Sequence, residues 1–549
     1  MYPPTPHQTY YHTISPAPAG LFYYLLSTER LPFYLTLLNS FIAKCYISNG
    51  YKGPILLLVK PAFQPLNNIY RSQAFNYQPK ETYICSMEWG KLYSTIRTGD
   101  SKDKKTNKDR VRTSFQRDYD RLIFSSAFRR LQNKTQVFPL PRAVFVHNRL
   151  THSLEVASVG RSLGKYVGDA IAEKYPDQSQ EFIDFYRYEL SSVIAAACLA
   201  HDIGNPPFGH SGEYAIRTFF KELDAETKEE ISKRLTAQQV KDFELFEGNS
   251  NALRILTNNF NERADGGYKL TYTTLASIVK YPCASHEGFN KATGQIATRK
   301  SGFFNSELDI YKDIAETLGI PKAEGFETVY ARHPFVYLTE AADDICYRII
   351  DMEDAHRLDI VTLEQIQELF YPFFDEPEGY NSREYIQKKV DSLHDGNQKV
   401  QYIRARWIGL MTDKLSRVFM QHEEELLAGT LQNDLLSCLP EKEKKLIDAI
   451  NDFSFKHIYN YKSVVEIEIA GYNVIGGLLQ ELMQAILHPE KTKSFKLLQL
   501  IPAQFHISKE RETLYEDIFS IVDFVSGMTD LYAIDIYRKI KGINIPEIK

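Results

Sequence analysis

Cysteine and tryptophan are scarce in this chain of 549 residues, which contains six cysteines and two tryptophans. No two cysteines stand in a CxxC spacing, so we expect neither a disulfide framework nor a zinc site built from thiolates. We interpret all six as reduced thiols, which is typical of a cytoplasmic protein. An excess of positive charge is also absent, because the formal net charge is −5, so no global basic field points to nucleic acid.

A long apolar run is missing as well. Residues 31–46 are apolar, but Asn39, Ser40 and Lys44 interrupt them, and the stretch is too short for a membrane span. It also lies too deep in the chain, without a basic leader, for a signal peptide. We therefore expect no membrane partner. The chain contains no P-loop, GxGxxG fingerprint or GxSxG elbow. The sequence therefore predicts none of the standard nucleotide-binding motifs.

Helical periodicity dominates the chain after residue 87 and strand signals are few, which predicts a mostly α protein. Residues 1–86 differ, because they are rich in Tyr, Pro and Phe and poor in acidic residues. They are either an extra helix packed on the body or upstream sequence that is not native, since Met87 opens a stretch that reads like a natural start. Among others, we expect helices over residues 147–175, 188–200, 275–282, 335–358 and 511–540.

The segment from Arg97 to Arg117 carries more Lys and Arg than Asp. A charged run of this kind is typical of a solvated linker. It would also suit a basic arm near a polyphosphate, which leaves the binding of single-stranded nucleic acid open. Steep salt dependence of such binding, lost when the arm is neutralised, would favour the second interpretation.

The most informative stretch covers residues 195–213, AAACLAHDIGNPPFGHSGE. An apolar helical run ends there in the adjacent pair His201 and Asp202, and two prolines then stop the helix. A helix that presents His and Asp side by side at its end can offer two metal ligands of different type. His210 and Glu213 follow with a spacing of three, so they face the same side. We expect them to form an acid–base pair in which the carboxylate orients the imidazole.

His152 and Asp343 join His201 and Asp202 in a set of two imidazoles and two carboxylates. Mixed nitrogen and oxygen ligands suit Mn, Fe, Co, Ni or Zn, and accept Mg less ideally. We expect magnesium or manganese first and keep iron, cobalt, nickel and zinc as alternatives. Two carboxylates would cancel one divalent charge, and open positions would admit water and a phosphate oxygen. This arrangement favours metal-assisted hydrolysis of a phosphoester.

A polar face also runs along the helix expected over 335–358. Asp343, Tyr347 and Asp351 stand four residues apart, so all three lie on one side of that helix. Asp344 points about 100° away and is the weaker ligand candidate. Lysines outside this helix would by themselves also suit a solvated surface. The candidate clamps for a polyphosphate are Arg149, Lys280 and Lys300.

The pattern H…HD…D across helices is the signature of the HD-domain phosphohydrolases, and longer strings resemble one family among them. The chain is similar to the deoxyguanosinetriphosphate triphosphohydrolases from about Met87 to about residue 540, and the first 86 residues are not covered. The strings that carry the resemblance are SSAFRRLQNKTQVFPL, HNRLTHSLEVASVGRSLG, AHDIGNPPFGHSGE, FEGNSNALRIL, ARHPFVYLTEAADDICYRIIDMED and DFVSGMTDLYA.

The resemblance implies an HD-domain catalytic core over 87–360, and helices over 361–549 that complete the pocket and make oligomer contacts. The implied reaction is metal-dependent hydrolysis of dGTP to a deoxynucleoside and tripolyphosphate, with other dNTPs as alternative substrates. Homo-oligomers and a regulatory nucleotide or nucleic-acid site are implied too. Leu531 departs from the family pattern, which has a basic residue there, so a phosphate or regulatory contact at this position is in doubt.

Residue roles follow from the same resemblance. It implies that the metal ligands are His152, His201, Asp202 and Asp343. It implies that the catalytic pair at the α-phosphate is His210 and Glu213. The implied substrate contacts are Tyr347 and Asp351 to the deoxyribose, Gln132 and Asn133 to the 3′-hydroxyl and base, and Arg149 to phosphate, with Glu247 beside the metal region.

Two alternatives remain open at this level. The chain could be another HD-type phosphohydrolase, acting on a 5′-nucleotide, a cyclic nucleotide or a guanosine polyphosphate. It could instead be a non-catalytic sensor of nucleotides or single-stranded nucleic acid. Free tripolyphosphate as product would separate the first alternative from the expected reaction, and the complete ligand set argues against the second.

Overall fold

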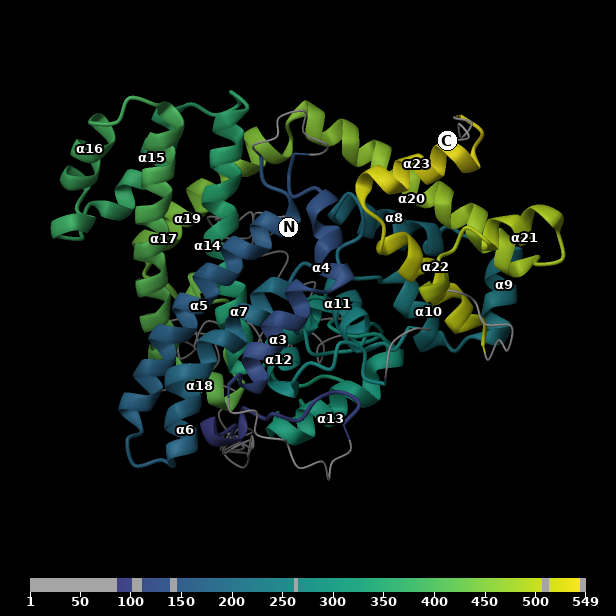
Figure 1. Ribbon diagram of the computed structural model, residues 1–549, viewed down its shortest axis with the longest axis horizontal. Coiled ribbons are helices and arrows are strands. Elements are labelled where there is room, and N and C mark those ends of the chain that lie inside the picture. The colour runs from purple at the N-terminus through teal and green to yellow at the C-terminus, as the bar shows by residue number, and fades with distance from the viewer. Residues whose placement is uncertain (1–85, 101–110, 139–145, 261–264, 506–512, 544–549) are drawn as a thin grey trace, which may run out of the picture. The chain divides into compact units, whose positions relative to one another are not determined.

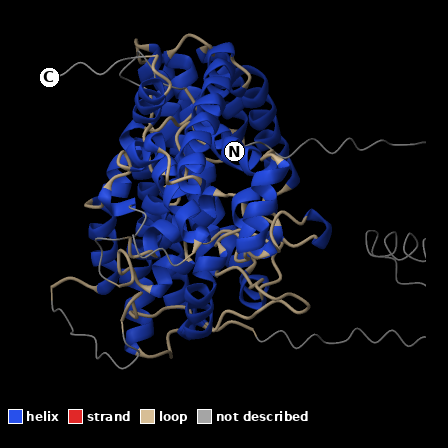
Figure 2. Cartoon of the chain, turned by 90° about the vertical axis from the view of Figure 1, so that its right-hand side faces the viewer, coloured by secondary structure: helices blue, strands red, loops and turns tan. Residues whose placement is uncertain are grey.

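The computed structural model describes residues 86–100, 111–138, 146–260, 265–505 and 513–543. Helices joined by loops make up this part of the chain, and Figure 2 draws no strand within it. Its β pairing is confined to four isolated bridges. The predicted mostly α class is therefore confirmed. The expectations for the N-terminal extension fall outside the described residues, apart from Ser86, and so do residues 101–110 of the predicted basic arm.

The described α-helices, with four of the short η helices, divide into an N-terminal and a C-terminal series. The first series consists of η4 (Trp89–Lys91), α3 (Ser114–Ile123), α4 (Ser126–Arg130), η5 (Leu131–Asn133), α5 (Arg149–Lys174), α6 (Gln180–Asp184), η6 (Phe185–Glu189), α7 (Leu190–Ala200), α8 (His210–Lys221), α9 (Ala225–Arg234), α10 (Ala237–Glu244), α11 (Gly248–Thr257), α12 (Tyr272–Ala276) and α13 (Leu308–Leu318). The second consists of α14 (Pro334–Arg357), α15 (Leu363–Phe370), α16 (Arg383–Asp391), α17 (Gly396–Gln421), α18 (Glu423–Ala428), α19 (Glu441–Ser454), η13 (Phe455–Tyr459), α20 (Lys462–Leu487), α21 (Thr492–Leu498), α22 (Leu514–Ser526) and α23 (Asp530–Ile540).

Two large apolar clusters hold most of the described helices together. The larger cluster takes side chains from α5, α7, α14 and α17. Every residue of α7 from Val193 to Ala200 is buried, which explains why this helix is apolar on all sides. The smaller cluster takes side chains from α8, α10, α20 and α22, which lie together on the right of Figure 1. The turn over 201–209 leads from α7 to α8 and therefore crosses from one cluster to the other.

Two expected helices have different bounds in the structure. The helix expected over 275–282 is α12, which begins earlier because the Thr271 side chain caps it by accepting from the Thr274 amide. Lys280 consequently lies in the loop after this helix. The helix expected over 511–540 is instead two helices, α22 and α23, and the Thr529 side chain caps the second one.

Among the described helices, none has both the length and the apolar character needed to cross a membrane. The longest helices, α5, α17 and α20, have 26 residues each, but none contains a sufficiently apolar window.

Candidate metal centre

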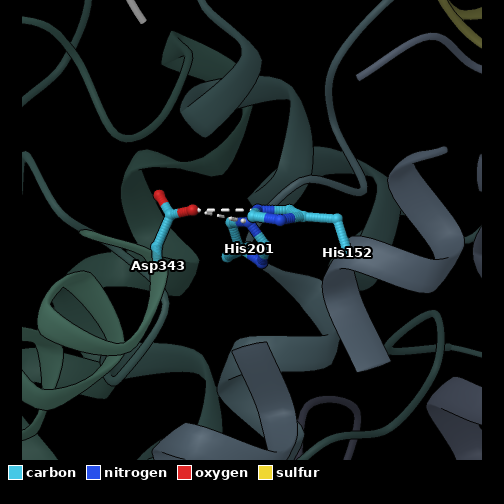
Figure 3. A group of neighbouring side chains, drawn as sticks. All are labelled: His152, His201 and Asp343. Carbon is cyan, nitrogen blue, oxygen red and sulfur yellow. Dashed lines mark hydrogen bonds and ion pairs between the residues drawn. The ribbon is translucent and has the colours of Figure 1, made fainter. Parts of the chain in front are cut away.

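Three helices bring His152, His201 and Asp343 together. His152 comes from the first turn of α5, His201 from the end of α7, and Asp343 from the middle of α14. One ligand atom from each residue lies within 4.8 Å of the other two, and all three residues are buried. Figure 3 shows both imidazoles pointing towards one oxygen of Asp343. The distances to that oxygen, Oδ1, are 3.1 Å from His152 Nε2 and 3.4 Å from His201 Nε2.

Local structure positions His152 and orients the imidazole of His201. The side chains of Asn148 and Thr151 form a capping box at the start of α5, which holds His152 in its first turn. His201 Nδ1 donates to the carbonyl oxygen of Cys198 at 2.6 Å. This bond leaves Nε2 of His201 directed towards Asp343 as the nitrogen that could bind a metal ion.

The donor set fits a divalent metal ion. The Nε2 atom of His201 is buried and has no hydrogen-bond partner within the described part of the chain. Buried polar atoms are normally satisfied, so a nitrogen of this kind needs an additional partner. Two imidazole nitrogens and a carboxylate oxygen at one point would supply that coordination. The identity of the metal stays a prediction.

Asp202 lies beside this group rather than within it. Its Oδ2 atom is 3.6 Å from His201 Nε2. The same oxygen accepts from the Arg149 guanidinium at 2.5 Å, and Oδ1 accepts from the Asn205 side chain at 2.5 Å. Burial would raise the pKa of Asp202, but Arg149 and His201 together hold it well below its ordinary value. Asp202 is therefore an oriented, ionised carboxylate at the edge of the three-residue group.

Lys280 is buried and pairs with the other oxygen of Asp343. Its Nζ atom lies 3.2 Å from Asp343 Oδ2. Burial would lower the pKa of the lysine, but the carboxylate raises it above its ordinary value, so the ammonium stays charged. A solvated surface position, which the sequence alone also allowed, is therefore excluded for this lysine.

His210 and Glu213 are in contact at the start of α8. His210 Nδ1 lies 3.0 Å from Glu213 Oε2, and Glu213 Oε1 accepts from the Gly248 amide at 2.8 Å. Burial lowers the pKa of His210, although Glu213 opposes this effect. Burial would raise the pKa of Glu213, but His210, Lys300 and Arg217 lower it below its ordinary value. The pair therefore combines a neutral imidazole with an ionised carboxylate near neutral pH.

Arg217 is a residue that the sequence reasoning missed. Its guanidinium donates to Glu247 Oε2 at 2.5 Å and lies 3.6 Å from Glu213 Oε2. Lys300 Nζ donates to the other oxygen of Glu247 at 2.8 Å. The spacing of Arg217, four residues after Glu213 on one helix, was the available signal. Glu247 thus anchors two cations beside the His210–Glu213 pair.

The polar face of α14 continues beyond Asp343. Tyr347 is half-buried, and the guanidinium of Arg348 lies 4.5 Å from its ring centre. Asp351 is buried and accepts from the Tyr459 hydroxyl at 2.7 Å. Burial raises the pKa of Asp351 to about 6. Tyr459, which belongs to η13, is a second residue that the sequence reasoning did not identify.

Gln132 and Asn133 are exposed on η5, and no hydrogen bond joins either side chain to the groups above within the described part of the chain. The next residue, Lys134, is buried instead. The structure therefore joins predicted site residues in one group around Asp343 and in another around Glu213 and Glu247, and it leaves Gln132 and Asn133 exposed.

Comparison with known proteins agrees with the helical arrangement. Residues 149–285 match the HD domain, and residues 437–539 match the phosphohydrolase-associated domain. A deoxyguanosinetriphosphate triphosphohydrolase-like protein of Synechocystis is 35% identical over 466 residues, which cover 84% of this chain and 100% of that protein. A similarly named protein of Listeria monocytogenes is 33% identical, over 83% of this chain and 100% of the relative.

A further relative carries the unqualified family name. The deoxyguanosinetriphosphate triphosphohydrolase of Yersinia enterocolitica is 30% identical over 492 residues, which cover 78% of this chain and 93% of that protein. The match to the HD domain and the buried group of His152, His201 and Asp343 both agree with these relatives. The chain belongs to the deoxyguanosinetriphosphate triphosphohydrolase family of HD-domain phosphohydrolases.

Proposed function

We propose that this protein hydrolyses dGTP to deoxyguanosine and inorganic tripolyphosphate. Water would form a new bond to the α-phosphorus, the bond from that phosphorus to the 5′-oxygen would break, and the 5′-oxygen would take up a proton. The observation that carries this proposal is the buried group of His152, His201 and Asp343, whose ligand atoms lie within 4.8 Å. Membership of the family supports the choice of substrate.

His152, His201, Asp202 and Asp343 would hold the divalent ion. When bound, such an ion supplies positive charge to phosphate oxygens and lowers the pKa of a coordinated water molecule. The bonds from Arg149 and Asn205 keep Asp202 oriented towards this position. Magnesium or manganese is the proposed metal.

His210 would move the proton between the attacking water and the 5′-oxygen. Its Nδ1 atom faces Glu213, so Nε2 is the nitrogen that exchanges a proton with the reactants. Burial favours the neutral imidazole, which can accept a proton near neutral pH. Glu213 stabilises the imidazolium that then forms, because it is ionised and fixed by the Gly248 amide.

Three cations would bind the polyphosphate. Each is paired with a carboxylate in the structure: Arg149 with Asp202, Lys280 with Asp343, and Lys300 with Glu247. Lys300 is the most accessible of the three, since its side chain is 29% exposed. It is therefore the cation best placed to exchange a carboxylate for a phosphate oxygen, while Glu247 keeps it near the site.

Tyr347 and Asp351 would contact the deoxyribose. The Arg348 guanidinium packs on the Tyr347 ring, and the Tyr459 hydroxyl holds Asp351. A ring fixed in this way leaves little room for a ribose 2′-hydroxyl, which favours deoxynucleotides. Gln132 and Asn133 would contact the 3′-hydroxyl and the base, for which their exposed amides are suited. A homo-oligomer, an effector site and a cytoplasmic location also stay predictions.

A product assay tests the proposal. The protein is incubated with Mn²⁺ or Mg²⁺ and each of the four dNTPs or GTP, and the products are resolved by anion-exchange chromatography. Tripolyphosphate from dGTP but not from GTP is the expected result. Release of pyrophosphate or monophosphate would place the protein with another class of HD phosphohydrolase. His201→Ala should abolish turnover, whereas His488→Ala, at a surface histidine, should not.

A further inference from the structure

Asp530, at the start of α23, contacts the turn that follows the His201–Asp202 pair. Its Oδ1 atom accepts from the Phe208 amide at 2.9 Å. Its Oδ2 atom accepts from both the amide, at 2.9 Å, and the hydroxyl of Thr135. Asp530 is only 1% exposed. A buried carboxylate is costly unless its oxygens are hydrogen-bonded, and here both of them are.

Lys134 makes a second tie between the same segments. Its Nζ atom donates to the carbonyl oxygen of Asn205 at 2.5 Å and to that of Ser526 at 2.8 Å. Asn205 belongs to the turn over 201–209, and Ser526 is the last residue of α22. The turn is therefore joined to the C-terminal helices at two points, one through Lys134 and one through Asp530.

The backbone of this turn depends on contacts from outside. Phe208 has a φ of 61°, which is unfavourable for a residue with a side chain, and Gly209 has a φ of 58°. A methyl group on Gly471 of α20 would lie 2.5 Å from the Phe208 ring, so this ring packs closely on the helix. The strained residue is thus held by its ring on one side and by its amide bond to Asp530 on the other.

The position of this strain matters for the site. The turn separates Asp202, beside the metal group, from His210, whose Nδ1 meets Glu213. Any change in the backbone at Phe208 would shift His210, two residues later, relative to the three metal-capable residues. Within the described part of the chain, the Phe208 amide makes no other hydrogen bond.

We propose that Asp530 is a positioning residue for the phosphohydrolase site, through which the C-terminal helices fix the distance between the metal group and His210. It acts through the Phe208 amide, with Thr135 holding its second oxygen, and Lys134 supports the same turn. The expected effect of Asp530 on turnover rests on the proposed function. Its expected effect on the backbone of the turn does not.

Asp530→Asn is the decisive variant. Both oxygens of Asp530 face N–H donors, whereas an asparagine has one oxygen and one NH₂ donor. Thr135 presents two donors and Phe208 one, so the remaining oxygen should face Thr135 and the Phe208 amide should lose its acceptor. Asp535→Asn is the matched control, because Asp535 lies on the same helix but its side chain is 45% exposed and pairs with Lys539. Thr135→Val removes the hydroxyl bond alone and should have a smaller effect than Asp530→Asn.

Amide hydrogen exchange, followed by mass spectrometry, is measured first on the peptide covering 203–210. Exchange there should be about tenfold faster in Asp530→Asn than in the unaltered protein or in Asp535→Asn. Peptides from α5 and α14 should exchange at unaltered rates, which separates a local effect from general unfolding. Unaltered exchange over 203–210 would overturn the proposal, whatever the enzyme does.

Kinetics then test the link to catalysis. For dGTP, Asp530→Asn should lower kcat about tenfold and leave KM within about twofold, because the metal group and sugar contacts are unaltered. Mn²⁺ affinity, measured by equilibrium dialysis, should also be unaltered. Faster exchange with a normal kcat would overturn the proposal. If the unaltered protein releases no tripolyphosphate from any dNTP, the proposed function fails, and hydrogen exchange alone decides whether Asp530 holds the turn.

Discussion

The guanidinium of Arg217 lies between two buried carboxylates, 2.5 Å from Glu247 and 3.6 Å from Glu213. Glu213 in turn meets the imidazole of His210. Two carboxylates this deeply buried repel each other unless cations lie near them. Lys300 donates to Glu247, and its charge also lowers the pKa of Glu213. Arg217 therefore acts with Lys300 to lower the pKa of Glu213 and to oppose the burial that raises the pKa of Glu247.

Arg217→Met should strongly impair both stability and turnover. Removing one partner of a buried charge network leaves the remaining charges uncompensated, which costs about 3 kcal/mol of unfolding free energy. Glu213 would then tend to take up a proton and orient His210 less well, so kcat should fall at least about tenfold. Urea unfolding and steady-state kinetics measure the two effects. Arg417→Met is the control, because Arg417 is an exposed arginine paired with Asp413, and it should change neither quantity appreciably.

His147 should make stability depend on pH. Its Nδ1 atom lies 2.8 Å from Asp354 Oδ1, and its Nε2 atom lies 3.3 Å from Glu155 Oε2. Burial would lower the pKa of His147, but these two carboxylates raise it to about 10. Because the folded pKa lies above the unfolded one, the stabilisation is complete below about pH 6.5. It is lost as the pH rises towards 10.

His147→Gln tests this dependence. The variant should be less stable than the unaltered protein by about 2 kcal/mol at pH 6, and the difference should shrink as the pH approaches 10. Urea unfolding at pH 6, 8 and 9.5 gives the three free energies. A difference that stays constant over this range would show that the histidine is not charged in the folded protein.

Tyr347→Ala should weaken the selection against ribonucleotides. The ring is held by Arg348 and lies on the α14 face that also carries Asp343 and Asp351, so its removal would open space where we place the sugar. We expect kcat/KM for GTP, relative to that for dGTP, to rise about tenfold. Tyr166→Ala, at an exposed tyrosine of α5, should leave the ratio as it is. An unaltered ratio in Tyr347→Ala would mean that the sugar is recognised elsewhere.

Metal binding should stabilise the fold through His201. A ligand that binds only the folded state at a hundred times its Kd contributes about 2.7 kcal/mol. Mn²⁺ should therefore raise the Tm, measured by calorimetry after chelation and dialysis, and a second chelation should reverse the change. His201→Ala should abolish the response, because this residue supplies a buried Nε2 atom that lacks a hydrogen-bond partner in the described part of the chain. A rise of equal size in His201→Ala would place the bound metal outside the proposed group.

Several parts of this site could be predicted from local spacing. The adjacent His201 and Asp202, the i, i+3 pair of His210 and Glu213, and the polar face from Asp343 to Asp351 each depend on the geometry of one helix end or one helix face. Helical spacing determines such relationships, so the sequence predicted them without a tertiary structure. The mostly α class and the family were predictable for a similar reason, because periodicity and long motifs are properties of the chain itself.

Local spacing carried no comparable information about pairings between distant segments. Lys280 could have been a surface lysine, Arg217 was not noticed, and Tyr459 lies 108 positions from the carboxylate that it contacts. The Phe208 amide meets Asp530 across 322 positions. The sequence by itself determined which side chains each helix presents to one face. Only the tertiary structure decided which charged side chains are buried next to one another. These contacts join residues far apart in the chain, and they form because the two large apolar clusters pack distant helices together.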